Sequence, residues 1–223
     1  MPEKEQWDDH WQILNERQSA FGLIARFVRR DIFQPAVRYY AEKCFPETGI
    51  FVEMGCGTAE SSALIPARRR RLCGLDFSLI ALQTARRGGY LSDLAAGDLL
   101  TLPFRDCSIT GIWNLGVMEH FPHDTLLRVL SEFRRVLEPG GIALLFWPTE
   151  FNSSRWILGP IERVRSALGG RQFRFFPDEV SRLRSKREAI QLLKATGFEV
   201  IRTDFSIRTA YIHMVVVARR ADT

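Results

Sequence analysis

The chain has 223 residues and a formal net charge of +5, with 46% hydrophobic residues and a mean hydropathy of −0.10. These values suit one soluble globular domain with a substantial core. The longest purely apolar run, residues 142–147, is far shorter than the roughly 20 residues of a membrane-spanning helix, and no signal-peptide pattern follows the acidic N-terminus. We therefore expect a single domain over residues 1–223 in a cytoplasmic protein.

Four cysteines and four histidines are spread along the chain without a C-x-x-C pair, which argues against disulfides and against a metal site. The pI of about 9.3 raises the question of nucleic acid, but the basic residues are mostly arginines interleaved with acidic residues. Such a pattern is typical of a solvated surface, and charge informs association rather than fold. We therefore expect no metal ion, and nucleic acid is the less favoured partner.

Residues 7–44 have apolar side chains at three-to-four-residue spacing, which predicts amphipathic helices. Pro35 is expected to break or kink the second of these helices, and residues 46–49 carry a turn signal. Because this part precedes the alternating pattern that follows, we expect residues 1–46 to form a helical lid.

From Ile50 onward, short apolar strands alternate with helices. The predicted helices cover residues 59–67, 79–87 and 124–137, with Ser78 as an N-cap and Gly88-Gly89 as a helix end. The predicted strands cover residues 50–53, 71–75, 90–96, 109–115 and 142–147. The region 50–147 therefore predicts an α/β core with a parallel sheet.

Residues 149–180 interrupt the alternation and predict an insertion after the fifth strand. A capping box at Ser185 and Glu188 then predicts a closing helix, and strands over 198–205 and 211–218 predict an antiparallel hairpin within the segment 185–220. The predicted fold is a doubly wound, Rossmann-like α/β sheet, mixed and seven-stranded, with an antiparallel last strand.

The glycine-rich stretch after the first strand predicts a ligand-binding loop. Gly55 and Gly57 let a ligand approach the backbone, and the following helix start favours an electronegative group. Asp76 and Asp98 each follow a later strand, and helix capping is an alternative role for both.

The ordered motifs resemble those of the class I S-adenosylmethionine-dependent methyltransferases, in the small-molecule branch. They are Glu53-x-Gly55-x-Gly57, Asp76, Gly97-Asp98, residues 114–120 and residues 137–141. Ala59 departs from the pattern, which often has a third glycine there. A dinucleotide-dependent dehydrogenase is the competing interpretation, but it normally needs G-x-G-x-x-G, and this chain has Glu60 at the last position.

The resemblance implies S-adenosylmethionine as cofactor and S-adenosylhomocysteine as product. The glycine loop would hold the methionine end, Asp76 the ribose and Asp98 the adenine amino group, while residues 114–120 would line the sulfur and face the acceptor. The cofactor-binding residues that we expect are Glu53, Gly55, Cys56, Gly57, Asp76, Phe77, Asp98, Leu99, Asn114 and Leu115.

The segment after the fourth strand lacks the motifs of nucleic-acid-base and arginine methyltransferases, so the resemblance favours methyl transfer to an O, N or C atom of a small molecule. His120 is the candidate general base, with a pocket-wall role as the alternative. The insertion predicts an apolar or aromatic acceptor and leaves open an anionic one, unless its side chains only pack on the domain. These side chains are Trp156, Arg171, Phe173, Arg174, Phe175 and Phe176. An RNA- or protein-directed enzyme and a non-catalytic partner subunit remain alternatives, and the oligomeric state is open.

Overall fold

The computed structural model describes residues 7–8, 11, 27–150 and 179–222 of the chain. Seven strands form one sheet in the order β3-β2-β1-β4-β5-β7-β6, in which only β7 runs antiparallel to its neighbours. The strands are β1 (Thr48–Met54), β2 (Arg69–Asp76), β3 (Asp93–Ala96), β4 (Ile109–Leu115), β5 (Leu137–Pro148), β6 (Phe198–Asp204) and β7 (His213–Arg220). This arrangement confirms the predicted seven-stranded mixed sheet.

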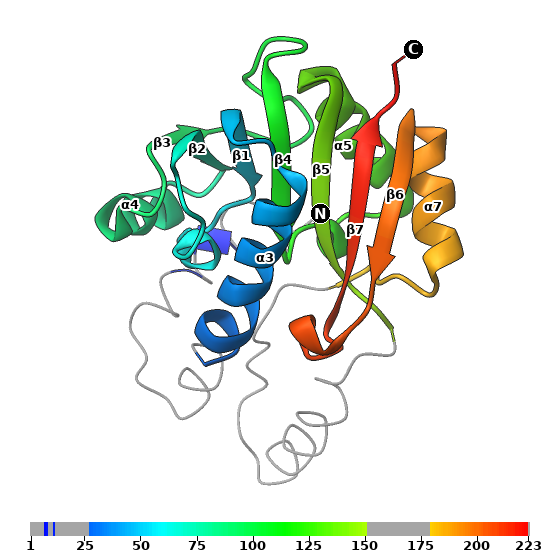
Figure 1. Ribbon diagram of the computed structural model, residues 1–223, viewed down its shortest axis with the longest axis horizontal. Coiled ribbons are helices and arrows are strands. Elements are labelled where there is room, and N and C mark those ends of the chain that lie inside the picture. The colour runs from blue at the N-terminus through cyan, green and yellow to red at the C-terminus, as the bar shows by residue number, and fades with distance from the viewer. Residues whose placement is uncertain (1–6, 9–10, 12–26, 151–178, 223) are drawn as a thin grey trace, which may run out of the picture.

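Helices cover both faces of the sheet. Figure 1 shows α3 (Gln34–Cys44) in front of the sheet and α5 (His123–Val136) behind it, with α4 (Leu79–Gly88) beside β3 and α7 (Lys186–Ala195) beside β6. Separate apolar clusters fill the two interfaces, one around Phe133 and Leu145 and one around Tyr40 and Phe146. Because β5 contributes to both clusters, its continuous apolar sequence is that of a strand buried on both faces.

The N-terminal helices differ in detail from the prediction at Pro35. A π-helix, η1 (Val28–Phe33), continues directly into α3, and Pro35 occupies the first turn of α3. Pro35 has no N–H to donate, and it lies where the π-helical hydrogen-bond pattern ends and the α-helical one begins. Pro35 therefore marks the change from π- to α-helix without breaking the chain into two helices. Most of the predicted lid, including residues 12–26, lies outside the described residues.

The predicted helix over residues 59–67 is wrong. Only a 3₁₀ turn, η2 (Glu60–Ser62), forms there, and Ala59 before it is left-handed, with φ of 57°. This conformation lets the chain turn back at once, so that Ser61 and Ser62 face Glu53 of β1. The helical pattern in the sequence is overridden by these buried hydrogen bonds.

The capped helices agree with the sequence. Ser78 Oγ accepts a hydrogen bond from Ala81 N at the start of α4, and Gly89 follows the helix with φ of 66°. Ser185 Oγ caps α7 in the same way through Glu188 N. The fifth strand, predicted over residues 142–147, begins already at Leu137. Its first part contains a bulge, in which Thr110 of β4 lies opposite residues 138–141.

The described end of the predicted insertion forms a strap, which we define as residues 179–184. Leu183 N donates to Pro148 O and Leu183 O accepts from Glu150 N, both at 3.0 Å. The main-chain carbonyl of Glu119 also accepts from the amides of Val180 and Ser181. The strap is therefore fixed to the ends of β4 and β5, while the insertion residues from Trp156 to Phe176 lie outside the described residues. No helix within the described ranges is long and apolar enough to cross a membrane.

Candidate cofactor and acceptor site

The loop after β1 is hydrogen-bonded to the end of β2. Gly55 N and Cys56 N donate to Leu75 O at 2.8 and 2.9 Å, and Gly57 N donates to Asp76 Oδ2 at 2.8 Å. The carboxyl ends of neighbouring parallel strands meet at one edge of a sheet, and that is where these groups lie. The structure therefore brings the glycine loop and Asp76 together, as the sequence spacing predicts.

Asp76 is held firmly at this edge. Its second carboxylate oxygen accepts from Ser78 N at 2.9 Å, and the residue is 5% exposed. Burial raises the pKa of Asp76, and hydrogen bonds from the amides of Ser78, Gly57 and Phe77 oppose that rise. The helix cap itself is Ser78, so Asp76 orders the loop without capping α4.

Gly55 and Gly57 are required by the local backbone. Both have positive φ, 71° and 52°, a conformation that side chains disfavour. A Cβ at Gly57 would lie 2.6 Å from the Trp11 ring, and one at Gly55 would lie 2.7 Å from Val117. The loop therefore lies in close contact with the N-terminal segment on one side and with the loop after β4 on the other.

Glu53 lies beneath the glycine loop in a buried hydrogen-bond network. Its two carboxylate oxygens accept from the hydroxyls of Ser61 and Ser62, and Trp113 Nε1 donates to Ser62 Oγ at 3.2 Å. Desolvation raises the pKa of Glu53 to about 7, although these hydrogen bonds favour the charged form. Glu53 is thus a carboxyl group poised to change charge near neutral pH.

The other expected cofactor residues occupy different surroundings along the same edge. Leu99 is buried, and Phe77, Leu115 and Cys56 are half-buried or buried. Asp98 is exposed and its Oδ1 accepts from Leu100 N at 2.9 Å. Asn114 is fully buried at the end of β4, where its Oδ1 accepts from Phe146 N at 3.3 Å.

The loop after β4 carries Glu119 and His120, which are 4% and 6% exposed. His120 Nε2 lies 3.9 Å from Glu119 Oε1. Glu119 Oε1 also lies 3.7 Å from where a Cβ on Gly116 would be, which places its carboxyl group over the start of this loop. Desolvation raises the pKa of Glu119 to about 8, with Glu179 raising it further and Arg182 opposing the rise.

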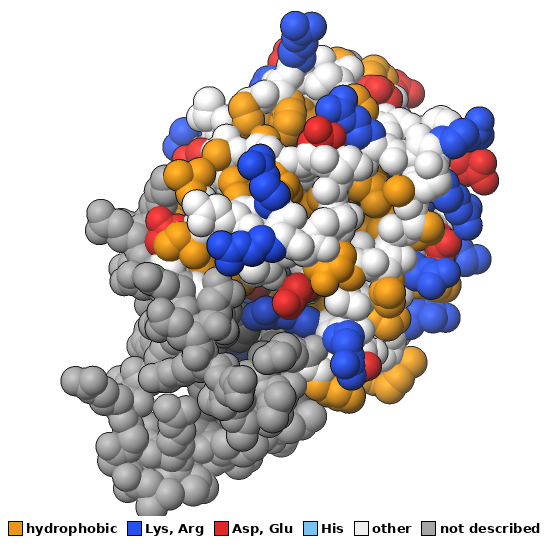
Figure 2. Space-filling view, turned by 90° about the vertical axis from the view of Figure 1, so that its left-hand side faces the viewer, with side chains coloured by type: hydrophobic (Ala, Val, Ile, Leu, Met, Phe, Trp, Pro, Cys, Tyr) orange, Lys and Arg blue, Asp and Glu red, His pale blue; other side chains and the backbone are white. Residues whose placement is uncertain are grey.

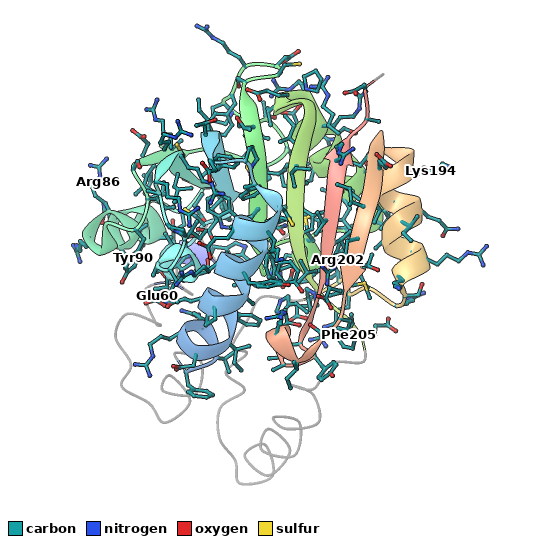
Figure 3. The ribbon with its side chains drawn as sticks, in the orientation of Figure 1. Glu60, Arg86, Tyr90, Lys194, Arg202 and Phe205 are labelled. Carbon is teal, nitrogen blue, oxygen red and sulfur yellow. The ribbon has the colours of Figure 1, made fainter. Side chains whose placement is uncertain are left out.

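Three described N-terminal residues contact this edge of the sheet. The Trp7 ring packs edge-on against His120 and Phe77, with centroid distances of 4.9 and 6.4 Å. Asp8 accepts a hydrogen bond from the Ser78 hydroxyl, and Trp11 lies over Gly57. Figure 3 shows the same end of the sheet, with Glu60 and Phe205 on opposite sides of α3.

These residues suit S-adenosylmethionine chemically. A buried carboxylate at the end of β2 suits vicinal hydroxyls, Glu53 offers negative charge near the loop, and glycines leave room beside the backbone. The loop amides of Gly55, Cys56 and Gly57 are already bonded within the chain. The described residues contain no group of three or more metal-ligating side chains.

Comparison with known proteins places this geometry in a family. Residues 52–145 match the family model described as a methyltransferase domain. A putative methyltransferase from Encephalitozoon cuniculi is 33% identical over 53% of this chain and 54% of its own length. A probable S-adenosylmethionine-dependent methyltransferase from Mycolicibacterium smegmatis is 30% identical over 67% of this chain and 51% of its own. A probable tRNA methyltransferase 9B from Mus musculus is 30% identical over 55% of this chain and 27% of its own.

Among solved structures, magnesium protoporphyrin IX methyltransferase from Synechocystis PCC 6803 with bound S-adenosylhomocysteine has a TM-score of 0.68 at 16% identity. That match covers 96% of this chain and 94% of the other, which supports the fold. Residues 52–145 are similar to the methyltransferase-domain family, and the fold of the chain is that of the class I S-adenosylmethionine-dependent methyltransferases. The chain spans about half the length of the first two of these relatives.

Several residues at this site were not predicted from the sequence. The sequence predicts a helix at Ser61 and Ser62. The one sequence signal for their hydrogen bonds to Glu53 is that this acidic residue precedes them by eight and nine positions. Arg182 lies in the strap and His213 at the start of β7, and no local motif indicates that Arg182 interacts electrostatically with both Glu119 and His213. The helical pattern around Trp7 and Trp11 predicts a lid but does not indicate which residues the two rings contact.

Proposed function

We propose that this protein transfers a methyl group from S-adenosylmethionine to a small-molecule acceptor. The observation that carries the proposal is the bond from Gly57 N to Asp76 Oδ2, which joins the family's two cofactor motifs into one site. The burial of Glu119 and His120 beneath Trp7 supports a small acceptor, because a polynucleotide needs an open surface. The cofactor-binding residues that we assign are those expected from the sequence, with Asp76 at the ribose and Asp98 at the adenine.

The cofactor supplies a methyl group on a sulfonium, and transfer is an in-line displacement. The chain contributes positioning and exclusion of water, both of which accelerate such a reaction. His120 accepts the proton that a hydroxyl or amine acceptor loses as the new bond to carbon forms. Trp7 limits access of water to His120 because their rings are in edge-to-face contact.

The N-terminal segment acts as a lid over the cofactor in this proposal. Trp7, Asp8 and Trp11 each contact a different part of the site, namely the β4 loop, the α4 start and the glycine loop. A bound cofactor would be covered by the same three residues. We assign residues 149–180 as the acceptor cap, since the strap at its end joins the β4 loop.

Two measurements test the proposed function. Isothermal titration of the purified chain with S-adenosylhomocysteine should give saturable one-to-one binding. Incubation with methyl-labelled S-adenosylmethionine and a small-metabolite extract should then transfer label to a low-mass product. No binding would refute the cofactor assignment, and binding without transfer to any acceptor would instead indicate a non-catalytic subunit.

RNA is the second candidate acceptor, because relatives named as tRNA methyltransferases match this chain. On the face drawn in Figure 2, Lys and Arg side chains are scattered among acidic, apolar and neutral atoms and do not gather in one stripe. On this face, that distribution disfavours a track for a phosphate backbone. Transfer of label to tRNA, with binding that weakens steeply as salt rises, would favour RNA over a small molecule.

A further inference from the structure

Three buried polar atoms at the carboxyl ends of β4 and β5 and in the strap beside them have no hydrogen-bond partner among the described residues. They are Glu119 Oε2, Arg182 Nη1 and His213 Nδ1. Glu119 and His213 are 4% and 7% exposed, so water from bulk solvent does not reach them freely. A buried polar atom without a partner costs about 1–3 kcal/mol, and each such atom therefore points to a missing partner.

The three side chains come from separate elements at the same end of the sheet, where His213 of β7 pairs with Pro148 of β5. Glu119 belongs to the β4 loop, and its carbonyl accepts from the amides of Val180 and Ser181 in the strap. Arg182 follows in the strap and interacts electrostatically with both Glu119 and His213. Arg182 therefore links the other two side chains electrostatically.

At neutral pH each of the three atoms can donate a hydrogen bond. The pKa of Glu119 is raised to about 8, so its carboxyl group is protonated at pH 7. Burial and the nearby Arg182 lower the pKa of His213 to about 3, so its ring is neutral and can carry its proton on Nδ1. Arg182 bonds to Glu179 through Nε, which leaves the N–H groups of Nη1 directed elsewhere.

We propose that Glu119, Arg182 and His213 form a binding subsite for a carboxylate group on the methyl acceptor. A cluster of donors is best satisfied by a group that brings lone pairs and no proton of its own. A carboxylate offers about four lone-pair positions on two oxygens, whereas a primary amide would turn two N–H groups toward the donors. This inference rests on the proposed function, because it specifies the acceptor of that same site.

The subsite has a defined pH dependence. The charged and titratable groups that face Glu119 are His120 on its own loop, Glu179 and Arg182 on the strap, and His213 on β7 only through Arg182. Glu179 and Arg182 form an ion pair, so Glu119 is the group that adds net charge as pH rises. Ionisation of Glu119 places a negative charge beside the bound carboxylate, so carboxylate binding weakens as pH rises through about 8.

The experiment uses the full chain saturated with S-adenosylhomocysteine. The probes are benzoate, salicylate, indole-3-acetate and octanoate, each paired with its own primary amide, and binding is measured by calorimetry or ligand-observed NMR. We expect at least one carboxylate to bind about tenfold or more tightly than its amide, the ratio given by one hydrogen bond to a charged group. Equal affinities within every pair, absence of binding included, would overturn the proposal.

Variants test whether the three residues cause the preference for a carboxylate over its amide. Glu179→Gln combined with Arg182→Met removes the arginine donor without leaving an unpaired acid, and His213→Phe removes the other nitrogen donor. Each should abolish the preference, whereas Arg184→Gln, an exposed arginine of the same strap that pairs with Glu150, should preserve it. Glu119→Gln keeps a neutral donor, so carboxylate binding should persist from pH 7 to pH 9.5 only in that variant.

The possible failures can be told apart. A preference unchanged by both donor variants, or wild-type binding independent of pH in this range, would show that the orphaned atoms do not hold the acceptor. Loss of S-adenosylhomocysteine binding would instead count against the cofactor site, which is measured separately in the same samples.

Discussion

The two halves of the site differ in how their buried polar groups are satisfied. At the ends of β1 and β2, the carboxylates of Asp76 and Glu53 accept hydrogen bonds from loop amides and serine hydroxyls of the same chain. Beyond the end of β4, Glu119, Arg182 and His213 each keep a buried atom without a partner among the described residues. In the first half these carboxylates have hydrogen-bond partners within the chain. In the second half, three buried polar atoms are left to hydrogen-bond with a ligand.

This difference fits two separate functions, cofactor binding in the first half and acceptor binding in the second. A fully bonded network fixes its members in one geometry, which suits a site that always binds the same cofactor. Unsatisfied donors cost stability in the free protein and are repaired by a ligand with matching acceptors. The comparison therefore predicts that changes in the first half affect cofactor binding and folding, and that changes in the second affect the acceptor alone.

The largest expected effect concerns Glu53, whose pKa is raised from 4.5 to about 7 in the folded protein. The folded state binds this proton more tightly than the unfolded state, so the contribution of Glu53 to stability is greatest below pH 4.5 and is lost as pH rises through 7. Glu53→Gln removes this contribution. Relative to wild type, its free energy of unfolding should rise by roughly 2.5 kcal/mol between pH 5 and pH 8, measured by urea denaturation. Parallel pH curves would contradict the assignment.

Asp76→Asn should weaken S-adenosylhomocysteine binding about 50-fold, because charged hydrogen bonds to the ribose contribute about 1.5–3 kcal/mol each. Asparagine keeps one oxygen for Gly57 or Ser78, so the loop should still fold. Titration calorimetry measures the affinity, with Asp93→Asn on the neighbouring strand as control, since Asp93 is exposed and pairs with Arg71. Wild-type affinity in Asp76→Asn would place the ribose elsewhere.

Gly57→Ala should weaken S-adenosylhomocysteine binding about tenfold, because the new Cβ meets Trp11 in addition to the backbone strain of positive φ. Gly89→Ala is a close control, since Gly89 has φ of 66° and open space around it. Both variants should lose about 1 kcal/mol of stability, but only Gly57→Ala should lose affinity. An equal loss of affinity in the two would show that the contact with Trp11 is unimportant.

The smallest expected effect distinguishes the role of Ser78 as a helix cap from its role in holding the lid. Ser78→Ala and Ser185→Ala each remove an N-cap hydrogen bond of 3.2 Å, and each should cost about 1 kcal/mol in thermal unfolding. Only Ser78 also bonds to Asp8. Stopped-flow measurements should therefore show faster S-adenosylhomocysteine dissociation in Ser78→Ala alone, and identical rates in both would argue against a lid held at Asp8.

The fold was largely predictable because its signals are local. Apolar runs, helix caps at Ser78 and Ser185, and the spacing from Gly57 to Asp76 each depend on a few neighbouring residues. The failures came from distant contacts. The segment after Ala59 loses its helix to hydrogen bonds with Glu53, and β5 begins earlier than predicted because residues 138–141 form a bulge against β4.

The two halves of the site differ for the same reason in how well the sequence predicts them. Glu53, Gly57 and Asp76 lie within one strand–loop–strand unit, so the sequence alone brings them together. Arg182 approaches Glu119 and His213 only after the chain has returned from the insertion and the hairpin has paired with β5. No rule of sequence spacing predicts contacts between residues so far apart in the chain. The individual roles of the cofactor-binding residues stay predictions.

The hydrogen bonds that join Glu150 and Pro148 to Leu183 have an evolutionary consequence. They close the chain on itself at the base of residues 151–178, so the two ends of that segment are fixed independently of its length. Doubling the length of a loop with fixed ends costs only about 0.6 kcal/mol of closure entropy. Insertions and deletions between these two anchors therefore cost folding little, while the glycine loop and Asp76 stay unchanged.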